Sequence, residues 1–344
     1  MRKIYSSLNT DIVPLSKADR LLPRFGTICR ILFAFFTTLI VISSLYLGLS
    51  LNASLLVDVP LREGHLTEGI VGSPRFVNPL LAISEADRDL TELVYSGLMR
   101  RYTDGTLIPD LAQSYSLAED GKSYTFTLRD WVTFHDGTRV GADDILFTVA
   151  KTQDPALKSP KRANWDGVVA EKVDERTVRF TLREPYAPFL ENTTLGILPA
   201  HLWQGATSDE FPFSSLNTNP IGSGPYKVNK ITRNSSGIPA SYSLTPFQEY
   251  ALGEPYLALT LRFYENEETL ITALTRNDIE AVNSISPESL RSLSDFEVRQ
   301  APLNRVFGVF FNQNQAEVLQ IKDVRAALNM ALNRDALVTD VLEG

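Results

Sequence analysis

The sequence predicts an α/β protein with two lobes, preceded by one membrane-spanning helix. The chain has 344 residues, 44% of them hydrophobic and 22% charged, which is more than one compact domain usually holds. An uncharged apolar run occupies residues 31–51. Beyond Pro60, short alternating patterns typical of strands are interspersed with helical patterns and Gly/Pro turns, and neither repeats nor low-complexity tracts occur.

The composition narrows the classes of function. The formal net charge is −8, and basic residues form no block outside the N-terminus, so the sequence argues against a nucleic-acid partner. Cys29 is the only cysteine in the sequence, which excludes an internal disulfide and a cysteine-based metal site. Stability must therefore come from packing.

The apolar run 31–51 is predicted to cross a membrane, because a helix of this length measures about 31 Å and a hydrocarbon core about 30 Å. Basic residues before the run place residues 1–30 in the cytoplasm: Arg2, Lys3, Lys17, Arg20, Arg24 and Arg30. A cleaved signal peptide and a buried core helix are the alternatives. The run exceeds the usual signal-peptide apolar region of about 7–15 residues, and Leu51 stands where a cleavage site needs a small residue. An uncleaved anchor in the cell membrane is favoured, with residues 52–63 as a linker to an extracytoplasmic domain.

The first elements after the linker are predicted from their periodicity. Residues 66–71 read as a strand, and Gly72, Ser73 and Pro74 as the loop that ends it. Residues 85–99 carry apolar side chains at helical spacing and are expected to form one helix.

Two antiparallel strands and a helix are expected next. Residues 122–128 alternate polar and apolar side chains, and residues 131–134 follow as a second strand. Residues 141–151 read as a helix with Asp143 and Asp144 in its first turn, where carboxylates suit the helix dipole.

The rest of the chain continues in the same mixed style. The expected elements are hairpins at 168–173/177–182 and 225–232/240–246, a strand at 257–264, a helix at 266–276 capped by Asn266, a strand at 278–282, a short helix opened by Ser286 and Pro287, a buried strand at 306–311, and helices at 321–333 and 335–343.

A search for catalytic or metal-binding constellations finds none that is convincing. His65, His135 and His201 are scattered without the spacing of a zinc or iron site. Phosphate-binding glycine loops and a nucleophile elbow are absent from the sequence, and the adjacent carboxylates 143/144 and 267/268 occupy first turns of helices. We therefore expect no catalytic residues, no metal, no cofactor and no enzymatic activity.

Several segments, in order, resemble the solute-binding proteins of peptide, oligopeptide and nickel ABC importers (family 5). The most specific stretch is 120–138, DGKSYTFTLRDWVTFHDGT, which is close to a family fingerprint. His135 belongs to its Phe-His-Asp-Gly turn and is read as structural. The other similar segments are Asn78-Pro79, DLTELVYSGL at 89–98, PDLAQSY at 109–115, ADDI at 142–145, NPIGSGPYK at 219–227 and DVRAALNMALNRD at 323–335.

The resemblance implies a periplasmic-binding-protein-like fold with two lobes (type II, class C). The first lobe is expected at 64–300, with an inserted sheet-rich subdomain at about 95–205, and the second lobe begins at 301–344. Proteins of this family continue for a large further segment, so the second lobe is expected to be incomplete and the chain to be truncated at its C-terminus. Hinge closure of two lobes over a ligand is a known way to signal a partner.

The implied function is that of the extracytoplasmic binding component of an ABC importer. It would capture peptides or a related small solute and present them to a permease, and through it to ATPase subunits. The expected ligand-contacting residues are the loop Gly72, Ser73, Pro74, Arg75 and Phe76, together with Phe307 and Phe310. A solvated Arg75 and core positions for the two phenylalanines are the structural alternatives.

Two other functions remain open from the sequence. One is a membrane-anchored peptide-binding sensor, which residues 1–30 disfavour because they are too short for a cytoplasmic output domain. The other is an extracytoplasmic hydrolase whose catalytic residues lie in the missing C-terminal part.

Overall fold

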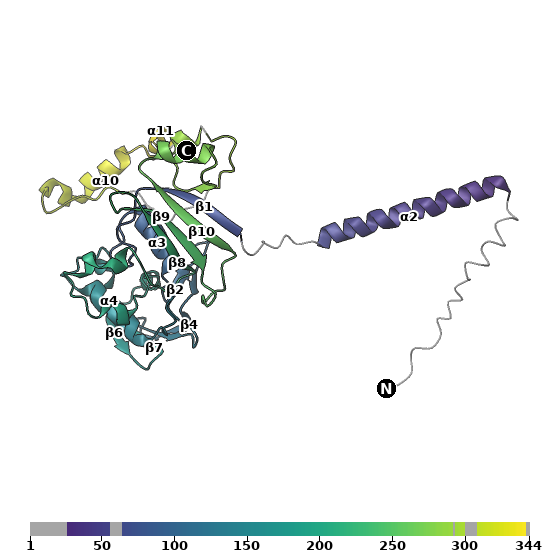
Figure 1. Cartoon of the computed structure of the whole chain (residues 1–344). Helices are drawn as coiled ribbons and strands as arrows, with labels where there is room; N and C mark the ends of the chain where they lie inside the picture. Colours follow the sequence, from purple (N-terminus) through teal and green to yellow (C-terminus); the bar gives the residue numbers. More distant parts are fainter. Residues whose placement is uncertain (1–25, 56–63, 292, 300–307, 342–344) are drawn as a thin grey trace. The chain divides into compact units, whose positions relative to one another are not determined.

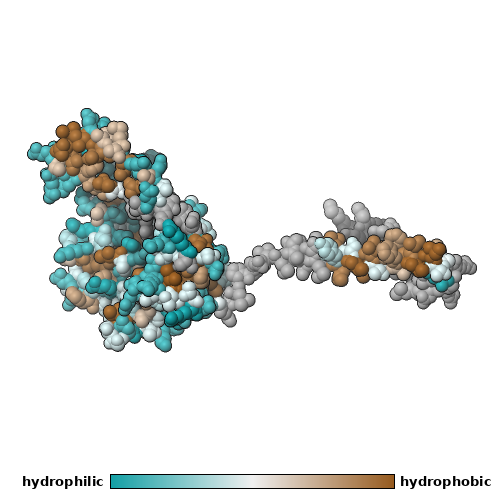
Figure 2. All heavy atoms as spheres, turned by 90° about the horizontal axis from the view of Figure 1, so that it is seen from above, coloured by the Kyte–Doolittle hydropathy of each residue, from teal (hydrophilic) through white to brown (hydrophobic). Residues whose placement is uncertain are grey.

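The computed structural model describes residues 26–55, 64–291, 293–299 and 308–341, and it divides into a unit that contains the first 61 residues and a second unit from Arg62 onward (Figure 1). In the first unit, helix α2 runs from Thr27 to Leu55. Its Thr27–Gly48 part has a mean hydropathy of 2.2 and is long enough to cross a membrane by length and composition. Hydrophobic residues cover most of its described surface, as Figure 2 shows. A helix that is apolar all round and buries none of this surface suits lipid better than water.

The second unit contains a five-stranded mixed sheet with the order β11-β1-β10-β9-β8. Strand β1 (Gly64–Val71) is parallel to both β10 (Leu257–Tyr264) and β11 (Ala281–Val282). Strand β9 (Pro239–Pro246) pairs antiparallel with β10, and β8 (Tyr226–Arg233) pairs antiparallel with β9. The predicted hairpin of β8 and β9 and the predicted strand at 257–264 are confirmed.

A four-stranded antiparallel sheet with the order β4-β5-β7-β6 lies in the chain between β1 and β8. Its strands are β4 (Ala112–Leu117), β5 (Ser123–Leu128), β6 (Val169–Lys172) and β7 (Thr177–Thr181). A small hairpin of β2 (Met99–Arg101) and β3 (Leu107–Pro109) precedes it. Alternate residues of β5 point inward, as its period-two pattern predicts.

The helices of the second unit are mostly short. They are α3 (Glu85–Val94), α4 (Ala142–Gln153), α5 (Arg162–Trp165), α6 (Phe189–Asn192), α7 (Ala200–Trp203), α8 (Glu267–Thr275), α9 (Pro287–Leu290), α10 (Lys322–Ala331) and α11 (Arg334–Val341). Asn266 caps α8 and Ser286 caps α9, with Pro287 at the first helical position, as predicted.

One buried cluster extends from the five-stranded sheet to the four-stranded sheet. Aromatic rings form its centre beside β5 and β7: the ring centroid of Phe180 lies 5.8 Å from that of Phe126, 5.6 Å from that of Trp165 and 5.7 Å from that of Phe189. All three contacts are edge-to-face, a favoured arrangement of aromatic rings. A smaller cluster lies under α8 and includes Leu270, Leu274 and Ile279.

Three predicted elements differ from the structure. The helix expected at 85–99 ends at Val94, because Tyr95 is extended and the Gly224 N–H donates to the Val94 carbonyl at 2.8 Å. Residues 131–134 form no strand beyond a single bridge between Thr133 and Arg139, since β4 and β7 occupy both edges of β5.

The buried strand expected at 306–311 is also wrong for its described part. Residues 308–311 form no strand, and the side chains of Val309 and Phe310 are 76% and 96% exposed. No strand in the described ranges pairs with this segment. Residues 306 and 307 lie outside the described residues.

Candidate ligand-binding site

Three parallel strands end at the same edge of the five-stranded sheet. Strands β1, β10 and β11 run in one direction, so the loops that follow Val71, Tyr264 and Val282 meet there. In open α/β sheets, ligands bind beyond the carboxyl ends of the parallel strands. We call the loop at 72–76 and the loop at 283–286, with the first turns of α3 and α8 beside them, the carboxyl edge.

The first loop, Gly72–Phe76, is held to the sheet by its backbone. Gly72 has φ +90°, a conformation that favours glycine, and its N–H donates to the Tyr264 carbonyl at 2.8 Å. Pro74 is buried and Phe76 packs against the core. The side chains of this loop that remain accessible are those of Ser73 and Arg75.

Asp87 of α3 fixes the second half of the loop. Its Oδ1 accepts hydrogen bonds from the backbone N–H groups of Arg75 at 2.7 Å and Phe76 at 2.9 Å. Its other oxygen accepts from the N–H of Ser84, whose hydroxyl in turn caps the helix. One buried carboxylate therefore organises both the loop and the start of α3, and leaves the Arg75 side chain exposed on a rigid backbone.

The second loop, at 283–286, joins β11 to α9 and is hydrogen-bonded to α3. The Asn283 amide donates to the Asp89 carboxylate at 3.1 Å, and the Ser284 hydroxyl donates to Glu85. Ser284 has φ +53°, a left-handed conformation that is unusual for a residue with a side chain. Strained backbone of this kind is concentrated at ligand and switch sites.

The carboxyl edge carries partly buried acidic groups. Burial raises the pKa of Glu68 on β1, and the neighbouring Asp89 raises it further. Burial also raises the pKa of Asp89, against a lowering by its hydrogen bond from Asn283. The edge thus offers carboxylates that a cationic group would stabilise, close to a loop that offers the guanidinium of Arg75.

Arg75 forms no ion pair with any residue in the described part of the chain. Its guanidinium lies 5.6 Å from the ring centroid of Phe76, a cation–π distance. The sequence-based alternative of an exposed Arg75 and the ligand role are both compatible with this position, because a ligand would supply the missing anion.

The structure brings together some of the predicted site residues. Gly72, Ser73, Pro74, Arg75 and Phe76 form one loop at the carboxyl edge, as expected. Phe307 lies outside the described residues. Phe310 is almost fully exposed, so the alternative of a core position for it is wrong and its contact with ligand stays a prediction.

Other residues of the edge were not foreseen from the sequence. Asn283 and Ser284 follow a two-residue strand, and Glu85 and Asp89 look like ordinary acidic residues of a helix. Their proximity depends on the pairing of β1 with β11, which no local pattern announces.

Two histidines, His135 and His201, have structural surroundings. His135 is buried, its Nδ1 accepts from the Gly222 N–H at 3.3 Å, and its Nε2 lies 3.0 Å from the Gly224 carbonyl. Burial lowers the pKa of His135 to about 4, with a further lowering by Lys227, so the ring is neutral at pH 7. His201 pairs with Asp136 at 2.8 Å. Within the described ranges, His, Cys, Asp and Glu side chains form no group of three or more that could hold a metal ion.

This arrangement is that of a mixed α/β protein with loops gathered at the carboxyl ends of its parallel strands. Comparison with known sequences gives the family. The family model described as "Bacterial extracellular solute-binding proteins, family 5 Middle" matches residues 106–344. The chain belongs to the bacterial extracellular solute-binding proteins of family 5.

Individual relatives agree with this assignment. The chain is 28% identical over 296 residues to the probable D,D-dipeptide-binding periplasmic protein DdpA of Escherichia coli, covering 81% of this chain and 55% of that protein. It is 26% identical to the oligopeptide-binding protein AppA of Bacillus subtilis, covering 83% of this chain and 53% of the relative. The chain thus spans about half the length of the curated relatives that it matches.

Solved structures confirm the two-lobed binding-protein fold class. The ABC transporter substrate-binding protein CtaP of Listeria monocytogenes matches with a TM-score of 0.67 and 32% identity, over 81% of this chain and 56% of CtaP. NikZ of Campylobacter jejuni, solved in complex with Ni(L-His), matches with a TM-score of 0.63 and 27% identity, over 81% of this chain and 55% of NikZ.

Proposed function

We propose that this protein is the extracytoplasmic substrate-binding component of an ABC importer and captures peptides, or a related small solute, without changing them chemically. The observation that carries the proposal is the carboxyl edge of a family 5 protein, where the exposed Arg75 lies on a loop fixed by Asp87. Relatives named for dipeptides, oligopeptides and a nickel–histidine complex support this class of ligand.

Peptides fit the charges of this edge. A free peptide carries a carboxylate that the guanidinium of Arg75 can bind through charge-assisted hydrogen bonds, and an ammonium that the carboxylates of Glu85 and Asp89 can stabilise. Main-chain pairing of an extended peptide gives affinity with broad side-chain tolerance.

Capture would use two lobes joined by a hinge. We assign the first lobe to 64–300, with the sheet-rich part at about 95–205 as an insertion, and the start of the second lobe to 301–344. The position of β2 to β7 between β1 and β8 in the chain supports the insertion. The closed form would then be presented to the membrane permease, whose ATPase subunits supply the energy.

We also propose that α2 anchors the protein in the cell membrane with residues 1–30 in the cytoplasm. Its length, its apolar surface and the basic residues before it support an anchor. A cleaved signal peptide is the alternative, and mass spectrometry of the membrane-extracted protein distinguishes the two. Recovery of a chain that has lost the residues up to about 51 would refute the anchor.

The function is tested by calorimetric titration of the full chain in detergent with L-alanyl-L-alanine and with its C-terminal amide. We expect the free acid to bind more tightly, and Arg75→Gln to weaken it about tenfold, since about 1.4 kcal/mol corresponds to a factor of ten and a charged hydrogen bond contributes about that much. The matched control is Arg139→Gln, an exposed arginine of the 131–139 turn.

Two outcomes would contradict the proposal. If the free acid and the amide bind with equal affinity to the wild type and to Arg75→Gln, Arg75 does not contact the ligand carboxylate. Conversion of the dipeptide during incubation, detected by liquid chromatography, would favour a hydrolase over a transport receptor.

A further inference from the structure

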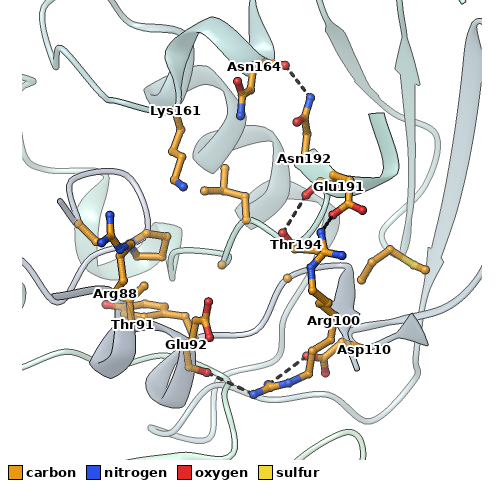
Figure 3. A pocket seen from close by; sticks show the side chains of 18 of the residues that line it. Arg88, Thr91, Glu92, Arg100, Asp110, Lys161, Asn164, Glu191, Asn192 and Thr194 are labelled. Carbon is orange, nitrogen blue, oxygen red and sulfur yellow. Dashed lines mark hydrogen bonds and ion pairs between the residues drawn. The ribbon is translucent and has the colours of Figure 1, made fainter. Parts of the chain in front are cut away.

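A cavity of about 400 Å³ lies beside α3, and it shares no residue with the loops of the carboxyl edge. Its walls come from α3, from β2 and the loop after it, from the segment around α5, and from residues 191–196. The volume lies in the lower part of the range of small-molecule pockets, about 300–1,000 Å³. Figure 3 shows polar side chains converging on it from these different elements.

Behind the floor of the cavity lie buried polar atoms that have no hydrogen-bond partner among the described residues. They are Thr91 Oγ1 and Tyr95 OH, in residues that are only 9% and 3% exposed. Each buried polar atom left unpaired costs about 1–3 kcal/mol, so native proteins keep few of them. These atoms are sealed from the cavity as well as from bulk water, so a molecule in the cavity would meet the charged side chains of its walls.

Some charges in the walls are already matched. Asp110 lies 3.7 Å from the Arg100 guanidinium, which also donates to Tyr250 OH at 2.9 Å. Arg101 pairs with Glu191 on the opposite segment. These contacts brace the walls against each other and leave little of either arginine's charge for a ligand.

Two cations of the cavity are not matched in the described part of the chain. Arg88 projects from α3 on one wall, and Lys161 projects toward the cavity from the other (Figure 3). Neither forms an ion pair there, and Glu92, one helical turn from Arg88, is likewise without one. The unmatched charges leave the cavity net positive.

We propose that this cavity is a second ligand site, for a small carboxylate-bearing molecule of amino-acid size. A carboxylate between Arg88 and Lys161 would be matched by a planar fork on one side and a point charge on the other. The carbon skeleton would pack against Trp165 and Leu195, which give the cavity its apolar part.

The test is calorimetric titration of the full chain in detergent with L-glutamate, succinate and, separately, inorganic phosphate. We expect L-glutamate or succinate to bind, with affinity at least tenfold lower in Arg88→Gln and in Lys161→Gln. Lys161→Arg keeps the charge and should keep the affinity. The control is Arg162→Gln, the adjacent exposed arginine, which does not line this cavity.

The two substituted positions were chosen so that a loss of binding is not caused by a loss of folding. Arg88 is exposed and Lys161 half-buried, so neither substitution removes core packing, and unchanged melting temperatures verify this. Absence of binding by both carboxylates at millimolar concentration would overturn the proposal and leave the cavity to water. Equal affinity in all variants, or binding of phosphate without either carboxylate, would also overturn it.

Discussion

Acidification should weaken the contact between the His135 turn and the turn that contains Gly222 and Gly224. The two turns are joined by the His135 N–H, which donates to the Gly222 carbonyl at 2.7 Å, and by both ring nitrogens. Nε2–H donates to the Gly224 carbonyl, so Nδ1 must be the unprotonated acceptor for the Gly222 N–H. A proton on Nδ1 would set two donors against each other in a buried site.

The size of the effect follows from the pKa of the buried ring. His135 has a pKa of about 4 in the folded protein, against an ordinary value of 6.5. Between these values the unfolded chain binds a proton that the folded chain does not, so the free energy of unfolding falls as the pH falls through this window. The loss from this group is about 2 kcal/mol at pH 5 and approaches about 3 kcal/mol near pH 4.

Urea unfolding of the full chain in detergent, followed by tryptophan fluorescence at pH 7 and pH 5, measures this loss. His135→Gln keeps a donor for Gly224 and cannot titrate in this range, so its free energy of unfolding should fall by about 2 kcal/mol less than that of the wild type. Asp110, whose pKa burial raises to about 6, changes stability in the opposite direction but is present in both proteins. The same pH dependence in both proteins would refute the reasoning about His135.

Two predictions concern the packing that supports the site. Gly222→Ala should lower the melting temperature by several degrees, because its Cβ would lie 2.1 Å from the Val94 carbonyl oxygen and overpacking of this kind costs about 1–3 kcal/mol. The control is Gly205→Ala, whose Cβ would have no atom within 4 Å. Equal melting temperatures of the two variants would contradict the prediction. Asp87→Ala should speed amide hydrogen exchange at Arg75 and Phe76 and lower the free energy of unfolding by about 2–4 kcal/mol, since it unpairs their N–H groups and removes the capping box. Asp143→Ala, at an exposed first-turn position of α4, is the control and should not affect these amides. Unchanged exchange in Asp87→Ala would disprove the role of this carboxylate.

The sequence by itself determined the elements whose signals are local. The apolar run is the core of α2, the strand at 257–264 is β10 to the residue, and the caps Asn266 and Ser286 open α8 and α9. Side-chain periodicity and capping depend on residues within one or two turns of each other, so they can be read along the chain. The family resemblance likewise rests on contiguous segments, and the match over residues 106–344 confirms it.

Only the tertiary structure decided which segments become neighbours. It ended α3 at Val94 by placing Gly224 against the last carbonyl, although the apolar spacing continues to Leu98. It set β1 between β10 and β11, which brings Asn283 to Asp89 and defines the carboxyl edge. It also enclosed Thr91, Tyr95 and Asp110 in one cavity. Parallel pairing and cavity lining join residues far apart in the chain, and their free energy depends on shape and desolvation that no local pattern records.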